Sequence, residues 1–190
     1  MDKEKELPQR KRLRLKNFDY GSSGAYFITI CTKDRKILFA PVGADSISAR
    51  IGAIGQGNGA DSISARMVER TFLETISRYD GVDSPIYVVM PNHFHAIITI
   101  SRAGMESVHL RADMESAPTV SEIVQSFKRY STVEYTKLVK DGILPPFDKQ
   151  IWQRSFYDHV IRNQDDYDEI YKYIYENPMK WQFDQLYTEE

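Results

Sequence analysis

The chain has 190 residues, a length that suits one domain with a single sizeable core. Its 25 lysines and arginines stand against 27 aspartates and glutamates, so the net charge of −2 gives no sign of a nucleic-acid partner. The single cysteine, Cys31, excludes an intramolecular disulfide and a cysteine-based zinc site. No apolar run approaches the ~20 residues of a membrane span, and no secretory apolar region follows the charged N-terminus. We therefore expect a protein of the reducing cytoplasm with no membrane partner.

The charge is spread unevenly along the chain. Residues 1–16 hold seven bases, Arg12 and Arg14 among them, against three acids. This basic N-terminal arm is compatible with contact to phosphates, and a solvated, poorly ordered arm fits the same charge pattern. Residues 165–190 hold eight acids against two bases, and we expect residues 183–190 to form an acidic tail.

The sequence up to residue 116 predicts two strands near its start and contains two duplicated segments. A β-branched and aromatic run at residues 25–32 follows a glycine-serine turn and predicts a strand, and residues 37–40 predict a short second strand. Residues 43–50 then recur as 59–66, and residues 102–107 recur loosely as 111–116. Two copies are too few for a repeat fold, so we interpret both duplications as loop insertions, at about 43–66 and 102–116.

The remaining elements follow from hydrophobic periodicity. In chain order they are a helix at 64–79, strands at 85–90 and 94–100, a helix at 118–139, a strand at 155–161 and a helix at 165–177. The helix at 118–139 has Ser121 as its expected N-cap. Its expected buried stripe consists of Val120, Ile123, Val124, Phe127 and Tyr135. This order predicts an α+β fold, an antiparallel sheet with helices packed on one face.

The most informative stretch is Met90-Pro91-Asn92-His93-Phe94-His95. Side chains alternate along a strand, so His93 and His95 share one face while Phe94 points to the other. Paired imidazoles suit a divalent metal ion, although two polar side chains on a solvated sheet face fit the same pattern. The two other histidines, His109 and His159, are interpreted as structural or surface residues.

The last predicted helix carries a second pair. Its expected core stripe consists of Tyr167, Ile170, Tyr171 and Ile174. Tyr173 and Asn177 are i and i+4 and stack beside that stripe, which places a phenol one turn from an amide oxygen. A nucleophile beside a metal ligand is one interpretation. An interfacial tyrosine and an asparagine that ends the helix before Pro178 is the other.

The histidine pair and the Tyr173–Asn177 pair together indicate a protein family more specifically than either pair does alone. A strand with Pro-x-His-apolar-His, a downstream Trp152-Gln153 and a helix reading Tyr-Ile-x-x-Asn-Pro at residues 173–178 resemble the REP-associated tyrosine transposases. These belong to the HUH single-tyrosine transposase superfamily of bacterial insertion sequences. The matching stretches are residues 24–30, 90–95, 127–129, 152–163 and 173–180. The resemblance implies a ferredoxin-like (RRM-like) fold over residues 17–182, with the HUH metal site on the sheet, in a bacterial cytoplasmic protein.

The resemblance also implies roles for individual residues. His93 and His95 would be metal ligands, Asn177 the third ligand and Tyr173 the nucleophile. The implied metal is Mg²⁺ or Mn²⁺, while ligand type alone also permits Zn²⁺. The implied reaction is cleavage and rejoining of single-stranded, hairpin-associated DNA through a covalent 5′-phosphotyrosine.

The DNA contacts and the assembly state are less constrained. Candidates for contacts to the DNA backbone are Lys128, Arg129, Arg154 and Arg162, with Arg12 and Arg14 of the arm. Each of them taken alone also fits ordinary surface charge. A homodimer and a monomer are both compatible with the sequence. Two other functions stay open: a non-catalytic RRM-like nucleic-acid-binding module, and a nickase of the HUH replication-initiator or relaxase type.

Overall fold

The computed structural model describes residues 23–39, 63–101 and 118–188. Within them the elements are β1 (Gly24–Cys31), α1 (Ile63–Ile76), β2 (Val82–Met90), β3 (His93–Ile100), α2 (Val120–Lys140), β4 (Tyr157–Ile161) and α3 (Gln164–Glu176). Short 3-10 helices follow β1 at Lys33–Arg35 and α3 at Asn177–Phe183. No helix in this part of the chain is long and apolar enough to cross a membrane.

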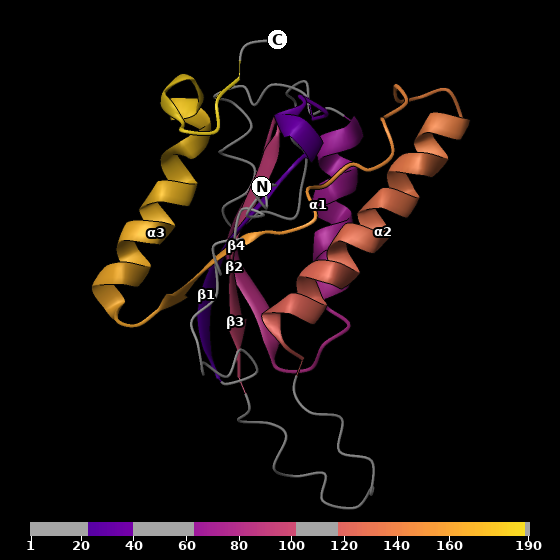
Figure 1. Ribbon diagram of the computed structural model, residues 1–190. Coiled ribbons are helices and arrows are strands. Elements are labelled where there is room, and N and C mark those ends of the chain that lie inside the picture. Colours follow the sequence, from indigo (N-terminus) through magenta and orange to yellow (C-terminus); the bar gives the residue numbers. More distant parts are fainter. Residues whose placement is uncertain (1–22, 40–62, 102–117, 189–190) are drawn as a thin grey trace, which may run out of the picture.

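The four strands form one antiparallel sheet in the order β2-β3-β1-β4. This strand order, with the succession βαββαβ, is the ferredoxin-like arrangement, which confirms the predicted fold. Figure 1 shows three layers, with α1 and α2 on one side of the sheet and α3 on the other. The prediction that helices pack on one face therefore holds for α1 and α2, whereas α3 covers the opposite face.

The main core lies between the sheet and the α1–α2 layer. Phe94 packs its ring 4.7 Å from that of Phe72 on α1 and 5.1 Å from that of Phe127 on α2. The alternate β3 residues Ala96, Ile98 and Ile100 belong to the same cluster, as strand alternation predicts. The predicted stripe of α2, namely Val120, Ile123, Val124, Phe127 and Tyr135, is buried throughout.

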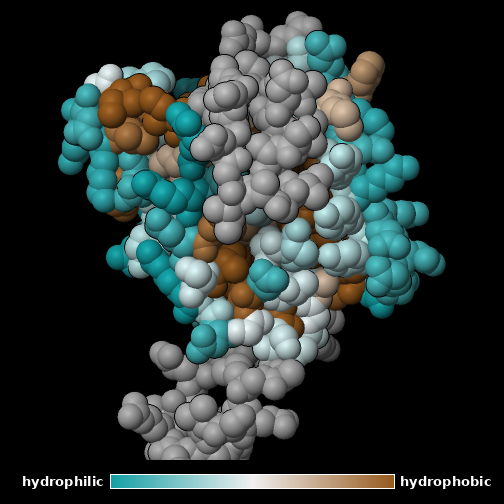
Figure 2. Space-filling view, turned by 180° about the vertical axis from the view of Figure 1, so that it is seen from behind, coloured by the Kyte–Doolittle hydropathy of each residue, from teal (hydrophilic) through white to brown (hydrophobic). Residues whose placement is uncertain are grey.

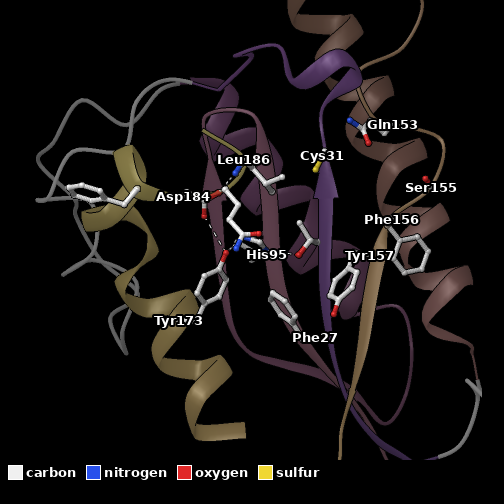
Figure 3. Close-up of a pocket in the computed structure, with 13 residues that line it drawn as sticks. Phe27, Cys31, His95, Gln153, Ser155, Phe156, Tyr157, Tyr173, Asp184 and Leu186 are labelled. Atoms are coloured by element: carbon white, nitrogen blue, oxygen red, sulfur yellow. Dashed lines mark hydrogen bonds between the residues drawn. The ribbon is translucent and has the colours of Figure 1, made fainter. Parts of the chain in front are cut away.

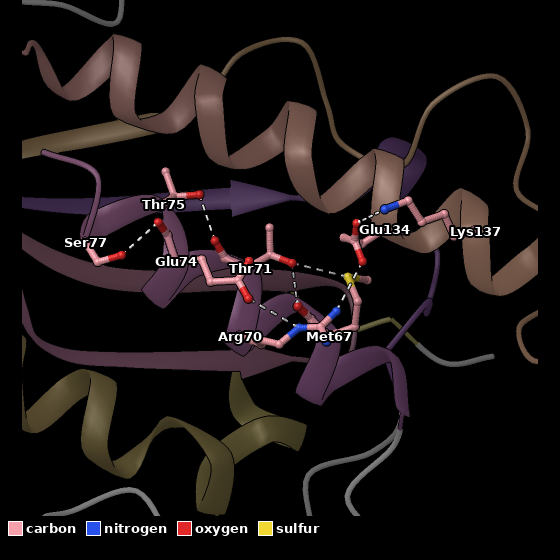
Figure 4. A network of polar contacts seen from close by, with 8 residues as sticks. All are labelled: Met67, Arg70, Thr71, Glu74, Thr75, Ser77, Glu134 and Lys137. Carbon is pink, nitrogen blue, oxygen red and sulfur yellow. Dashed lines mark hydrogen bonds and ion pairs between the residues drawn. The ribbon is translucent and has the colours of Figure 1, made fainter.

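Polar contacts join α1 to α2 at the rim of this core (Figure 4). Arg70 of α1 lies 3.2 Å from Glu134 of α2, in an exposed ion pair of the kind that adds little stability. Inside the layer, the buried hydroxyls of Thr71 and Thr75 each donate to a backbone carbonyl one turn earlier, at 2.7 Å. Their burial is therefore not penalised by an unmade hydrogen bond.

A second, smaller core lies between the sheet and α3. Val88, Met90 and Ile97 point to this face and are buried against Ile174 of α3. The rest of the predicted α3 stripe, Tyr167, Ile170 and Tyr171, packs around them. Seen from behind, the side of the molecule that carries α3 is mostly hydrophilic (Figure 2), so α3 is amphipathic and turns its apolar side inward. This second core explains why α3 leaves the other two helices, since an apolar sheet face must be covered.

The predicted short strand at residues 37–40 is wrong over its described part. Residues 37–39 form no strand; instead the backbone N–H groups of Leu38 and Phe39 both donate to the carbonyl of Pro91, at 3.1 and 3.0 Å. A hairpin partner would have to lie beside β1, but β3 and β4 already occupy both sides of it. Asp34 and Arg35, with φ of 57° and 55°, turn the chain away from the sheet.

Two further boundaries differ from the expectation. The N-cap of α2 is Thr119, not Ser121: the Thr119 hydroxyl accepts from the backbone of Glu122, whose carboxylate accepts from the backbone of Thr119. Helix α1 begins at Ile63, so the second copy of the duplication, residues 59–66, ends inside a helix. The insertion at 102–116, residues 43–62 of the first insertion, the basic arm with Arg12 and Arg14, and His109 lie outside the described residues.

Candidate active site

The strand register places the histidine pair beneath α3. His95 lies opposite Thr29 on β1 and Val88 on β2, and His93 lies two pairs further along. Their side chains are 2 % and 0 % exposed, because α3 and the segment after it cover this face. The alternative interpretation of His93 and His95, as polar side chains on a solvated sheet face, is thereby excluded. The rings lie 4.5 Å apart, between centroids.

Hydrogen bonds orient both imidazoles. Nδ1 of His93 lies 2.8 Å from Oδ1 of Asn92, which can only accept, so Nδ1 carries the proton and Nε2 keeps a free electron pair. That Nε2 atom is buried and has no hydrogen-bond partner. Nδ1 of His95 lies 2.9 Å from the hydroxyl of Thr29. Such bonds at the far nitrogen are typical of histidines that ligate a metal ion.

Both imidazoles are neutral at physiological pH. Burial lowers the pKa of His93 to about 3, and the charge of Arg35 contributes. Burial also lowers the pKa of His95 well below its usual value, with the neighbouring His93 adding to the effect. Neutral imidazole is the form that binds a metal ion, so the pair is ready to do so without losing protons.

Asp184, which the sequence did not indicate, offers a third candidate ligand atom. His93, His95 and Asp184 each offer an atom within 4.8 Å of the others. Asp184 lies in the stretch expected to form an acidic tail, yet the described part of this stretch, residues 183–188, folds back onto the sheet. Asn92 holds it there, since its Nδ2 donates to the carbonyl of Leu186 at 2.8 Å. No local sequence pattern marks Asp184, because its partners belong to a distant strand.

Tyr173 of α3 reaches the same cluster. Its ring is 45 % exposed, but its hydroxyl lies 3.4 Å from Nε2 of His95 and donates to Oδ2 of Asp184 at 3.2 Å. Burial, followed by the charge and hydrogen bond of Asp184, raises the pKa of Tyr173 to about 12, and a hydrogen bond from Asn177 opposes this. The phenol is therefore protonated at neutral pH and needs an acceptor for its proton.

Asn177 lies one turn after Tyr173, as the helical spacing predicts. Its side chain is 3 % exposed, and its Nδ2 donates to Oδ2 of Asp184 at 2.9 Å. Its Oδ1 is buried without a hydrogen-bond partner. Burying such an atom unpaired costs about 1–3 kcal/mol. Two orphaned acceptors, Oδ1 of Asn177 and Nε2 of His93, beside a carboxylate fit a divalent cation as their missing partner.

A pocket of about 750 Å³ opens beside these groups (Figure 3), within the range of ligand sites. Tyr173 and Asp184 form one side, Phe27 lies at the centre, and Tyr157 and Phe156 form the other side. The remaining lining residues are Thr29, Cys31, His95, Gln153, Ser155, Phe183, Gln185 and Leu186. The candidate nucleophile therefore faces a space that a substrate can enter.

The predicted DNA contacts have different surroundings. Lys128 is half-buried, and its ammonium donates to the carbonyls of Gln153 and Ser155, at 3.0 Å each. Arg154 is exposed in that same loop, between two pocket residues. Arg129 and Arg162 are exposed but line neither pocket described here. The structure thus gives Lys128 partners inside the protein.

Two residues near the site complete this picture. Arg35, which the sequence did not single out, is exposed at the end of the 3-10 helix Lys33–Arg35, and its charge lowers the pKa of His93. His159, interpreted as structural or surface, pairs through Nε2 with Asp166 at 2.9 Å. That pair joins β4 to the first turn of α3.

Comparison with known proteins gives a relative by sequence and solved structures that are similar to this chain. No protein-family model matches it. An uncharacterized protein of Haemophilus influenzae is 31% identical over 188 residues, which cover 96% of each chain. The structure of a REP-associated tyrosine transposase bound to a REP hairpin matches 94% of this chain and 77% of that one, with a TM-score of 0.51 and 20% identity. A candidate transposase from Deinococcus radiodurans matches with a TM-score of 0.45 and 12% identity, over 87% of this chain and 96% of that one. The chain belongs to one family with the Haemophilus influenzae protein, and it has the fold of the REP-associated tyrosine transposase.

Proposed function

We propose that the protein is a tyrosine transposase that cleaves and rejoins single-stranded, hairpin-associated DNA. The observation that carries this proposal is the convergence of Tyr173, His93, His95 and Asn177 from two distant segments. The Tyr173 hydroxyl lies 3.4 Å from His95, and two buried acceptors beside it lack partners. The structural neighbour that shares the fold is bound to a DNA hairpin, which supports the choice of substrate.

His93, His95 and Asn177 would hold Mg²⁺ or Mn²⁺, together with Asp184. The carboxylate improves the fit, because Mg²⁺ favours oxygen ligands over imidazole nitrogen. The bound ion supplies positive charge next to the scissile phosphate, where negative charge develops during transfer.

Tyr173 is the group that attacks phosphorus. As the bond between its Oη and the phosphorus forms, the hydroxyl proton moves to Oδ2 of Asp184, which already accepts its hydrogen bond. The bond from phosphorus to the 3′ oxygen breaks, and that oxygen leaves with the electron pair and takes up a proton. The products are a 5′-phosphotyrosine and a free 3′-hydroxyl. A 3′-hydroxyl of another strand reverses these steps and expels the phenolate, so rejoining needs no external energy source.

A covalent adduct tests the proposal directly. The protein is incubated with Mn²⁺ and a labelled DNA hairpin with single-stranded flanks, taken from the DNA beside the gene, and then run on a denaturing gel. We expect a labelled protein–DNA band that is lost in Tyr173→Phe and retained in Tyr175→Phe. Tyr175 is a matched control because it is partly exposed on the same helix and lines neither pocket. An adduct that persists in Tyr173→Phe would exclude Tyr173 as the nucleophile.

The same assay separates the two alternatives. Hairpin binding without any adduct would identify a non-catalytic binding module. An adduct that never passes its DNA to an added acceptor strand would indicate a nickase of the replication-initiator type. His93→Ala should abolish the adduct while most of the DNA affinity remains, since affinity for DNA comes mainly from cationic contacts to phosphates and His93 is a neutral imidazole.

A further inference from the structure

The pocket beside Tyr173 has an aromatic wall that the proposed chemistry does not use. Phe27 on β1 and Tyr157 on the neighbouring β4 point to the α3 side of the sheet, with ring centroids 6.3 Å apart. The Phe27 ring also lies 6.0 Å from that of Tyr173. Figure 3 shows Phe27 between Tyr173 and Tyr157, so the wall runs directly away from the candidate nucleophile.

Tyr157 contributes little to the core. Its side chain is 49 % exposed, although it is a large aromatic residue at the start of a strand. A second hollow of about 380 Å³ shares Phe27, Tyr157 and Tyr173 with the larger pocket and continues toward the start of α3. The aromatic wall therefore extends along the sheet face, as a surface on which a planar ring can stack.

Within the described part of the chain, the aromatic wall itself has no cationic side chain beside it that would favour a phosphate, so a neutral group is the better occupant. Among the described residues that line the larger pocket there is no lysine or arginine, and Asp184 contributes a carboxylate. Asp166 and Glu169 line the second hollow. A phosphate therefore suits the histidine cluster, where a metal ion would offset the negative charge, whereas an uncharged nucleobase suits the aromatic rings, on which it can stack.

Polar side chains line the same pocket as the aromatic wall. Gln153, Ser155 and Gln185 line the pocket with side chains that donate and accept hydrogen bonds. Lys128 holds the loop that carries Gln153 and Ser155 by donating hydrogen bonds to their carbonyls. The backbone N–H of Gln153 donates to the carbonyl of Cys31 at 2.9 Å, which ties the wall to β1. Polar side chains on a loop that is held in this way suit recognition of a base edge.

We propose that Phe27 and Tyr157 form a stacking subsite for one unpaired nucleobase of the DNA strand, beside the phosphate that Tyr173 attacks. The inference rests on the proposed function and names the part of the substrate that the pocket takes. The base binds here through its ring, and its phosphate remains at the histidine cluster.

Fluorescence anisotropy with two probes tests the subsite in the Tyr173→Phe background, where no chemistry takes place. One probe is a labelled oligothymidine of about ten nucleotides, and the other has the same length but abasic sugars throughout. Tyr157→Ala should weaken binding of oligothymidine roughly 5- to 150-fold and leave binding of the abasic strand unchanged. Tyr157→Phe should bind both probes as the parent does, because the stacking ring is kept. Tyr175→Ala serves as the control for loss of an exposed tyrosine.

Equal weakening on both probes would overturn the proposal, because it would show that Tyr157 acts through the DNA backbone or the fold. Unchanged oligothymidine binding in Tyr157→Ala would overturn it as well. A second readout uses an oligothymidine with a single 2-aminopurine, whose fluorescence should be quenched by stacking in the parent complex and recover in Tyr157→Ala. The adduct assay remains separate: a missing adduct with intact base-dependent binding refutes the chemistry and leaves the subsite standing.

Discussion

Tyr173 donates its hydroxyl to Oδ2 of Asp184 at 3.2 Å, across a separation of 11 residues. The 3-10 helix Asn177–Phe183 between them reverses the chain so that the carboxylate lies over the end of α3. The same oxygen accepts from Asn177. One carboxylate therefore holds the nucleophile, holds its helical neighbour and faces the histidine pair.

Asp184→Asn should lower the pKa of Tyr173. The carboxylate favours the neutral phenol by its charge and its hydrogen bond, so its removal should shift the pKa from about 12 toward the usual value near 10, while burial keeps it above that value. Titration of ¹³C-labelled tyrosine in EDTA, followed by NMR, measures the shift. The Tyr173 resonance is assigned by its loss in Tyr173→Phe. A pKa that stays at or rises above the parent value would contradict the role of Asp184.

Asn92 should control the metal affinity through His93. Its Oδ1 accepts the Nδ1 proton of His93, which directs the free pair of Nε2 into the site. Asn92→Ala should weaken Mn²⁺ binding about 10- to 100-fold, as measured by calorimetry. Asn92→Asp keeps the acceptor for His93 but loses the donor to Leu186, so it should retain more affinity than alanine. Equal affinities of the parent and Asn92→Ala would refute this role.

The metal-free protein should lose stability as the pH falls below about 6.5. Between that value and about 3, the unfolded state binds protons at His93 and His95 that the folded state does not, so the free energy of unfolding rises with pH in this window. Urea unfolding in EDTA at several pH values measures the slope. The double variant His93→Gln/His95→Gln should show a shallower slope, since glutamine does not titrate. Identical slopes would show that the histidines are not buried neutral.

Lys128 should stabilise the loop at residues 153–155, which lines the pocket. Lys128→Met removes hydrogen bonds to the carbonyls of Gln153 and Ser155 and should cost about 1–3 kcal/mol of unfolding free energy, with faster hydrogen exchange in residues 153–156. Lys128→Arg should recover part of the loss, because it keeps a charged donor. The sequence instead predicts a contact between Lys128 and the DNA backbone. That prediction is right if stability is unchanged while the salt dependence of single-strand binding falls by about 0.7 in slope.

Much of the fold followed from short-range patterns. Strand alternation predicted that His93 and His95 would share a face and that Phe94 would enter the core, and both hold. Helical periodicity predicted the buried stripes of α2 and α3 and the stacking of Asn177 one turn beyond Tyr173. These patterns are reliable because side chains two, three or four positions apart share a face whatever the rest of the chain does.

The errors lie where a local preference competed with the surrounding structure. Residues 37–39 have strand-forming side chains, but both sides of β1 were already taken. Ser121 is a good capping residue, yet Thr119 forms the reciprocal bonds with Glu122. The role of Lys128 stays a prediction, and only the tertiary structure shows that its ammonium has partners in the loop at 153–155.

By itself, the sequence determined most of the elements, the buried stripes of α2 and α3, and the face that His93 and His95 share, because those depend on the geometry of a single helix or strand. Only the tertiary structure decided that Asp184 joins the histidines, that Asn92 reaches Leu186 across 94 residues, and that Phe27 and Tyr157 form one wall. Such contacts depend on strand register and on where the chain returns after α3, which no spacing along the chain encodes. The uneven charge distribution is a further example. The acidic C-terminal stretch is expected to form a tail, but its Asp184 places a carboxylate beside His93 and His95.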